Sequence, residues 1–233
     1  MTTPTHDAEL VRTATEDLLS ATVKLDPSAI AEPSHLPGWT RGHVLTHLAR
    51  NADALVNVLA GKPMYASAEA READIEHGAT RNLDDQVDDV RTSASRLESA
   101  FASLGEEDWG RTVTLRNGVT DLASALPFRR WAEVELHHID MGIGYRLEDL
   151  SGTFLDRELA GMARRFLGHP DISVALELRA EDGRTWRTGA PEAGAEGPLV
   201  VVGSTVALVG WLTGRTTGSG LSARGSLPAL PAL

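Results

Sequence analysis

The segment Arg130-Trp-Ala-Glu-Val-Glu-Leu-His-His-Ile-Asp140 combines large apolar side chains with two carboxylates and two imidazoles. Glu133 and His137 are four residues apart, so on a helix their side chains lie on one face, roughly 5–6 Å apart at Cβ. A carboxylate oxygen and a neutral imidazole nitrogen placed in this way can bind a metal ion if a third ligand comes from another segment. The segment therefore predicts a helix that carries part of a metal site.

The third ligand is predicted on an earlier helix, residues 41–60. Apolar side chains recur at helical spacing around His47, and a lone imidazole among them costs desolvation energy unless it is paired or ligated. In helical bundles, ligands from facing helices converge in the core. We expect His47, Glu133 and His137 to form a site with open coordination positions, for which zinc is the default metal.

A simpler interpretation stays open on spacing alone. Pairs such as Glu133 and His137 are frequent on solvated helix faces, and a buried histidine can be hydrogen-bonded to a carboxylate without any metal. Asp140 lies one helical step from His137 and could orient its ring. Neither His138, which points about 100° away from His137, nor Glu135 belongs to the predicted site. The other histidines are expected on the surface or in loops: His6, His35, His43, His77 and His169.

Composition excludes several classes of protein. The chain has 233 residues and a net charge of −11, which argues against broad nucleic-acid binding and requires specific arginines for any anionic substrate. It has no cysteine, so chemistry that needs a thiol would depend on a cofactor that brings one. The N-terminus lacks the features of a signal peptide, and no apolar run is long enough to span a membrane. We expect a cytoplasmic protein with neither membrane nor nucleic-acid partners.

The hydrophobic pattern predicts an α+β fold with two domains. Residues 1–150 are expected to form a four-helix bundle, and residues 151–233 a smaller α/β domain that packs on it. The predicted helices span 7–24, 41–60, 66–77, 83–104, 124–144, 153–167 and 205–212, and the predicted strands span 172–180, 185–188 and 199–202. The tail after Thr216, which is rich in glycine and proline, is expected to be loosely held.

Whole motifs then resemble a known family. Leu36-Pro-Gly-Trp-Thr-Arg-Gly-His-Val-Leu-Thr-His47 and Ala132-Glu-Val-Glu-Leu-His-His-Ile-Asp-Met-Gly142 resemble the DinB-like metalloenzyme superfamily. Pro63-Met-Tyr-Ala-Ser-Ala-Glu-Ala-Arg-Glu-Ala-Asp-Ile75, with Val200-Val-Val-Gly-Ser204 and Gly214-Arg215, is similar to its mycothiol-dependent maleylpyruvate isomerases. The resemblance covers about Asp7 to Arg215 and implies a DinB-like bundle. His138 departs from it, because many relatives carry a small residue there.

The resemblance also implies roles for individual residues. His47, Glu133 and His137 match the family's zinc ligands, and Arg71 and Arg215 match arginines implicated in catalysis. Without the resemblance, Arg71 is better interpreted as a partner of carboxylates on its own helix surface. Arg215 is then a cation at a helix C-terminus. Both interpretations stay open at this point.

The implied reaction is the cis–trans isomerisation of maleylpyruvate to fumarylpyruvate in gentisate breakdown, an aromatic catabolic route. In that reaction the thiolate of mycothiol adds to the double bond, allows rotation and leaves, while zinc keeps the thiol deprotonated and arginines hold the substrate carboxylates. The expected partners are Zn²⁺, mycothiol and a small dicarboxylate, and the chain is expected to be a monomer or weak homo-oligomer. Two alternatives are a mycothiol S-transferase acting on electrophilic small molecules and a metal-binding module without catalysis.

Overall fold

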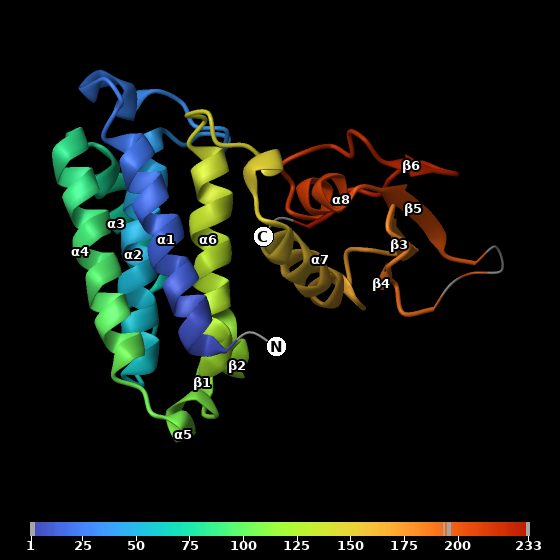
Figure 1. The fold of residues 1–233 in the computed structure, drawn as a ribbon, viewed down its shortest axis with the longest axis horizontal. Helices are drawn as coiled ribbons and strands as arrows, with labels where there is room; N and C mark the ends of the chain where they lie inside the picture. Colours follow the sequence, from blue (N-terminus) through green and yellow to red (C-terminus); the bar gives the residue numbers. More distant parts are fainter. Residues whose placement is uncertain (1–2, 193, 195–196, 232–233) are drawn as a thin grey trace. The chain divides into compact units, whose positions relative to one another are not determined.

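The chain forms two compact units, residues 1–145 and 146–233, in a computed structural model that describes residues 3–192, 194 and 197–231 (Figure 1). The first unit is mostly helical and the second contains a four-stranded sheet. This succession confirms the predicted α+β fold class. Among the described residues, we find no helix with the length and hydropathy needed to cross a bilayer.

Four long helices build the first unit: α1 (Pro4–Thr22), α2 (Arg41–Leu59), α4 (Leu83–Ala102) and α6 (Leu126–Asp140). α1 and α2 each pack against both α4 and α6, so the four helices enclose a common core. The prediction of a helix over 124–144 was too long at its C-terminal end. The chain turns at Gly142, whose φ of 63° lies in the left-handed region that ends helices.

The N-terminus of α2 is held by a capping box. The Thr40 hydroxyl accepts a hydrogen bond from the His43 backbone N–H, and the His43 ring nitrogen Nδ1 accepts one from the Thr40 N–H. The side chain of His43 is therefore only 14% exposed, and the expectation of a surface histidine was wrong there. The cap sets where α2 begins, and with it the height of His47 one turn further on.

A shorter helix, α3 (Ala68–Ala79), runs back along α2, so that its end lies beside Gly42 and its first turn beside His47. It starts two residues later than predicted, because the Ser67 hydroxyl caps it by accepting a hydrogen bond from the Ala70 N–H. This antiparallel arrangement places Arg71 of α3 beside His47 of α2.

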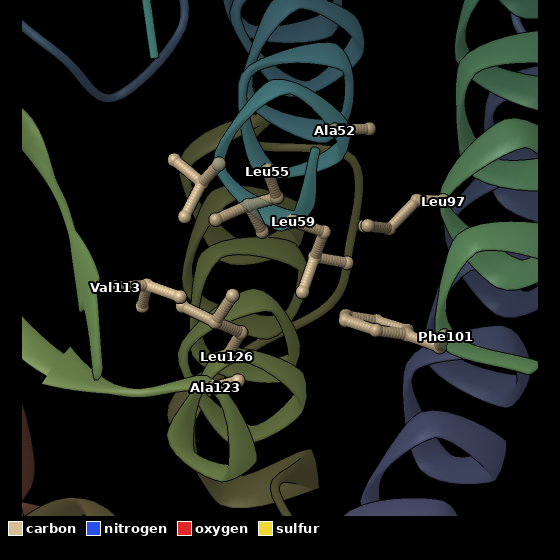
Figure 2. Close-up of a cluster of buried hydrophobic side chains, with 9 residues drawn as sticks. Ala52, Leu55, Leu59, Leu97, Phe101, Val113, Ala123 and Leu126 are labelled. Atoms are coloured by element: carbon tan, nitrogen blue, oxygen red, sulfur yellow. The ribbon is translucent and has the colours of Figure 1, made fainter. Parts of the chain in front are cut away.

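A compact connection closes the other end of the bundle. After the short helix α5 (Glu106–Trp109), strands β1 (Thr112–Thr114) and β2 (Thr120–Leu122) form an antiparallel hairpin around the 3₁₀ turn η2 (Arg116–Gly118). Figure 2 shows Val113 of β1 directed into a buried apolar cluster shared with α2, α4 and α6. The cluster contains Ala52, Leu55, Val58, Leu59, Leu97, Phe101, Val113, Ala123 and Leu126. It ties the hairpin to the helices.

The second unit combines two helices with one mixed sheet. Its elements are α7 (Gly152–Phe166), β3 (Ala175–Ala180), β4 (Thr185–Gly189), β5 (Leu199–Gly203), α8 (Thr205–Leu212) and β6 (Ser222–Ala223). The strand order is β4-β3-β5-β6, with β3 and β5 parallel and the other pairs antiparallel. The expectation of a loosely held tail was wrong in part, because Ser222 and Ala223 pair with β5. Short 3₁₀ turns, η1 (Pro27–Ala31), η3 (Ala123–Ala125) and η4 (Leu147–Asp149), complete the chain.

The contact between α2 and α3 gives a stability prediction. A Cβ on Gly42 would lie 2.3 Å from the backbone oxygen of Ala79, which cannot move without shifting α3. We expect Gly42→Ala to lower the free energy of unfolding by about 1–3 kcal/mol. Gly161→Ala in α7 is the matched control: its methyl would meet no atom within 4 Å, and helix propensity favours alanine by up to about 1 kcal/mol. Urea denaturation followed by circular dichroism measures both; equal stabilities would contradict the close α2–α3 contact.

Candidate functional site

Three side chains from two helices converge in the core of the bundle. His47 of α2 places Nε2 3.0 Å from Glu133 Oε2, and His137, one turn after Glu133 on α6, places its Nε2 3.4 Å from the same oxygen. The two imidazole rings meet edge to face, with centroids 4.7 Å apart. One ligand atom from each residue lies within 4.8 Å of the others, so the group could hold a metal ion.

The site is buried on one side and reachable on the other. The side chains of His47 and His137 are 9% and 14% exposed, whereas the side chain of Glu133 is 36% exposed. A small molecule can therefore approach the carboxylate while the two imidazoles stay shielded from bulk water.

The ring of His137 is oriented by Asp140. The His137 Nδ1 lies 2.9 Å from Asp140 Oδ2, and Asp140 itself is buried. With Nδ1 held by this carboxylate, Nε2 is the nitrogen that faces Glu133 and His47, and its lone pair would be the one offered to a metal ion there. This is the hydrogen-bonded arrangement in which a histidine serves as a metal ligand, and it agrees with the position predicted for Asp140.

Burial and hydrogen bonds shift the three pKa values in different directions. Burial lowers the pKa of His47. Burial acts in the same direction on His137, but hydrogen bonds to Asp140 and Glu133 outweigh it and raise the pKa of that ring. Burial alone would raise the pKa of Glu133, yet the hydrogen bonds from His137 and His47 hold it well below its usual range. Glu133 is therefore a carboxylate at neutral pH, as a metal ligand must be.

Arg71 lies against the site and does not pair with its own helix. Its Nη2 is 3.2 Å from His47 Nδ1, and its guanidinium carbon lies 5.7 Å from the centroid of the Tyr65 ring. Within the described residues, Arg71 forms no ion pair with Glu69, Glu72 or Asp74 and contacts His47 and Tyr65 instead, so the interpretation of a surface ion pair was wrong. The reason is tertiary: α3 turns this face toward α2.

The contact between Arg71 and His47 has a consequence for metal binding. A guanidinium group only donates hydrogen bonds, so Nδ1 of His47 must be the acceptor and the ring proton must sit on Nε2. A metal on Nε2 requires the other tautomer, with the proton on Nδ1. The hydrogen bond from Arg71 and a metal ion on His47 therefore exclude one another, and metal binding would release the guanidinium.

A second arginine is buried beside His47, Glu133 and His137, which we call the triad. Arg130, three residues before Glu133, is 1% exposed, and its Nη1 donates to the carbonyl of Leu48 and to Asn51 Oδ1 at 2.9 and 2.8 Å. Burial lowers the pKa of Arg130 to about 10, although the charge of Glu133 opposes this shift. The structure places its positive charge in the core, where it partly balances Glu133.

Two aromatic residues near the triad received no role from the sequence. The Trp39 ring lies 5.6 Å from the His47 ring between centroids, and Tyr65 lies under Arg71. Both follow a proline in a loop between helices, at Pro-Gly-Trp39 and Pro-Met-Tyr65, and an aromatic side chain in such a loop was the available signal. Arg41 fixes this end of the bundle, because its Nε donates to the carbonyl of Met141 at 2.9 Å.

The other polar residues of α6 lie outside the triad, as expected. Glu135 accepts hydrogen bonds from Trp131 Nε1 at 2.8 Å and from the Tyr145 hydroxyl at 2.7 Å. His138 stacks on the Tyr145 ring with centroids 4.2 Å apart. This buried side of α6 is a separate packing surface.

Arg215 belongs to the second unit, at the C-terminus of α8. Its backbone N–H donates to the carbonyl of Gly210 at 2.8 Å, and its Nη1 donates to the carbonyl of Thr213 at 2.7 Å. This is the position of a cation that complements the end of a helix. The catalytic role suggested for Arg215 by the resemblance stays a prediction.

Comparison with known families decides the relationship. Residues 11–142 match the model of the mycothiol maleylpyruvate isomerase N-terminal domain, and residues 149–232 match the C-terminal domain of the same family. The chain belongs to this family. It is similar to a crystal structure of the mycothiol-dependent maleylpyruvate isomerase, with 29% identity, a TM-score of 0.88 and full coverage of both chains. A His-to-Ala mutant of that enzyme matches with 28% identity, the same TM-score and full coverage.

No curated protein matches the chain in a sequence search. The family and the two crystal structures together make the chain an isomerase. The group of His47, Glu133 and His137 lies within the segment that matches the N-terminal domain.

The contact between His137 and Asp140 predicts the effect of a substitution on metal binding. We expect Asp140→Asn to weaken Zn²⁺ binding by about tenfold or more, because the uncharged amide orients and polarises the His137 ring less strongly. Competition with a chromophoric chelator measures the affinity. Glu135→Gln, a buried carboxylate on the same helix whose partners are Trp131 and Tyr145, is the matched control and should leave the affinity unchanged. Equal losses in both variants would mean that Asp140 acts only through folding.

The hydrogen bond from Arg71 to His47 predicts that replacing this arginine strengthens metal binding. We expect Arg71→Met to bind Zn²⁺ about three- to tenfold more tightly in the same assay, because a cation that competes for Nδ1 of His47 is removed. Arg71→Lys keeps the charge and should stay closer to the unsubstituted protein. Weaker metal binding by Arg71→Met would show that Arg71 supports His47 instead of competing for it.

Proposed function

We propose that the chain is a zinc- and mycothiol-dependent isomerase that converts maleylpyruvate to fumarylpyruvate, with His47, Glu133 and His137 as the metal ligands. The observation that carries the proposal is the convergence of these three donors next to Arg71, in a chain that belongs to the mycothiol maleylpyruvate isomerase family. A solvated helix face, the simpler interpretation of Glu133 and His137, would not account for this convergence of donors and arginine.

The donor set fits zinc. Two imidazoles and one carboxylate are typical ligands of catalytic zinc sites, in which the protein leaves a coordination position open. The hydrogen bond between Asp140 and His137 is the support that such a ligand requires. When bound, a zinc ion supplies a positive centre that keeps a thiol deprotonated at neutral pH.

The chain cannot supply the sulfur nucleophile itself. It contains no cysteine, so a thiol that adds reversibly to the substrate double bond must come from a cofactor. Mycothiol is the thiol after which the family and both matched structures are named. The absence of cysteine and the family relationship support the same cofactor.

Arg71 is proposed to bind and orient the dicarboxylate substrate. Once displaced from His47, its guanidinium has free N–H groups beside the metal ligands, in the fork geometry that suits a carboxylate. The same N–H groups would stabilise the negative charge that builds on the ketone oxygen while the double bond is interrupted. A catalytic role for Arg215, which the resemblance implies, is part of the proposal.

The local charge suits such a substrate. The chain as a whole has a charge of −11 and repels a dianion. Near the triad, however, Arg71 and the buried Arg130 add positive charge to that of the metal. A dianion is therefore attracted by this site and not by the general surface.

Turnover tests the proposal directly. With zinc-loaded protein, maleylpyruvate isomerisation followed by absorbance should require mycothiol and should fall by at least about a hundredfold in His47→Ala. Arg71→Met should lower kcat/KM by about ten- to a hundredfold, despite its tighter metal binding. Arg91→Met, an exposed arginine of α4 paired with Asp88, is the control and should keep full activity.

Two results would overturn the proposal. Equal rates with and without mycothiol would exclude a thiol cofactor. No isomerisation in the presence of zinc and mycothiol, combined with conjugation of mycothiol to an electrophile such as monochlorobimane, would instead identify a mycothiol S-transferase.

A further inference from the structure

A cavity of about 590 Å³ lies within the first unit, where α2 ends. Its walls come from three segments: the last turn of α2, the connection to α3, and strand β1 with the turn η2. None of the three metal-ligand candidates lines it, so it is a separate space that the proposed reaction has not used. Its volume suits a ligand much larger than a short-chain dicarboxylate.

Tyr65 connects this cavity with the triad. Its side chain lines the cavity, and its ring carries the guanidinium of Arg71, which in turn contacts His47. Val58 in the cavity wall lies eleven positions after His47 on α2, which corresponds to about 16 Å along the helix. A ligand with one end at the metal and the other in the cavity would therefore have to be long.

The lining of the cavity is rich in hydrogen-bond donors. Lys62, Arg111 and Arg116 contribute cations, and the hydroxyl and amide groups come from Ser67, Thr112, Thr114 and Asn117. No Asp or Glu lines it in the described part of the chain, although acidic residues outnumber basic ones by 33 to 22 overall. Such a surface suits a ligand that presents many oxygen acceptors.

The walls are held in place from behind. Val58 and Val113 line the cavity and also belong to the buried apolar cluster in Figure 2. Arg111 donates from Nη2 to the carbonyl of Leu59, and the backbone N–H of Arg116 contacts Met64 Sδ at 3.0 Å. The walls of the cavity are therefore anchored to the core, which preorganises them.

We propose that this cavity binds the polyhydroxylated sugar headgroup of mycothiol, so that the cysteine thiol reaches past Tyr65 to the metal ligands. The inference rests on the proposed function and adds a location to it. Sugar hydroxyls are acceptors for the cations and polar side chains, and the face of Tyr65 offers an apolar surface to the ring of a sugar. The small dianion remains at Arg71, beside the metal.

The test removes the donors of two exposed cavity residues. Lys62→Met/Arg116→Met keeps a long, unbranched side chain at both positions. It leaves the core untouched, since neither side chain is buried. We expect the KM for mycothiol to rise by about tenfold or more, with the KM for maleylpyruvate unchanged. Arg91→Met on α4, outside the cavity, is the control and should change neither.

A second measurement distinguishes binding from folding. The thiol-free headgroup of mycothiol should inhibit the unsubstituted enzyme competitively against mycothiol, and this inhibition should be lost in Lys62→Met/Arg116→Met. An unchanged KM for mycothiol, or a rise in the KM for maleylpyruvate alone, would overturn the inference while leaving the proposed function intact. Absence of mycothiol-dependent turnover in the unsubstituted protein would overturn both.

Discussion

A single carboxylate oxygen, Oε2 of Glu133, lies against two imidazole nitrogens inside a helical core, and most of the polar structure around it serves this contact. His47 and His137 are nearly buried, so each ring needs a partner to offset its lost hydration. Glu133 Oε2 is the partner of both rings, 3.0 Å from His47 Nε2 and 3.4 Å from His137 Nε2. Because the three groups come from two helices, the contact holds only if α2 and α6 keep a fixed height relative to each other. The Thr40 cap and the bonds from Arg41 to the end of α6 provide that constraint.

The same centre organises the charges of an acidic protein. Arg130 carries its charge in the core because Leu48 and Asn51 accept its hydrogen bonds and Glu133 lies one turn away. Arg71 reaches the centre from the opposite side, along α3. A metal ion would add more positive charge while neutralising Glu133. Under the proposed function, a loaded site would therefore attract an anionic substrate more strongly than an empty one.

Glycine at the contact of α2 and α3 makes this arrangement possible. Gly42 allows the backbone of Ala79 to approach closely, and Gly78 does the same for the side chain of Thr46. The close approach of the two helices brings Arg71 within hydrogen-bonding distance of His47. At the other end of α2, β1 and the turn η2 line the cavity beside Tyr65.

The sequence by itself determined the helices, the α+β class and the three residues that converge in the candidate metal site. Helical periodicity and the spacing of Glu133 and His137 are local properties. His47 lies within an apolar stripe, where an imidazole requires a partner to offset its lost hydration. Other features depended on tertiary structure: the direction of Arg71, the burial of Arg130, the capping role of His43 and the cavity beside Tyr65. His47 and Glu133 are 86 residues apart, and Arg71 and His47 are 24 apart. Periodicity identifies the face of each helix, but which faces meet, and how closely, is decided only when the helices pack.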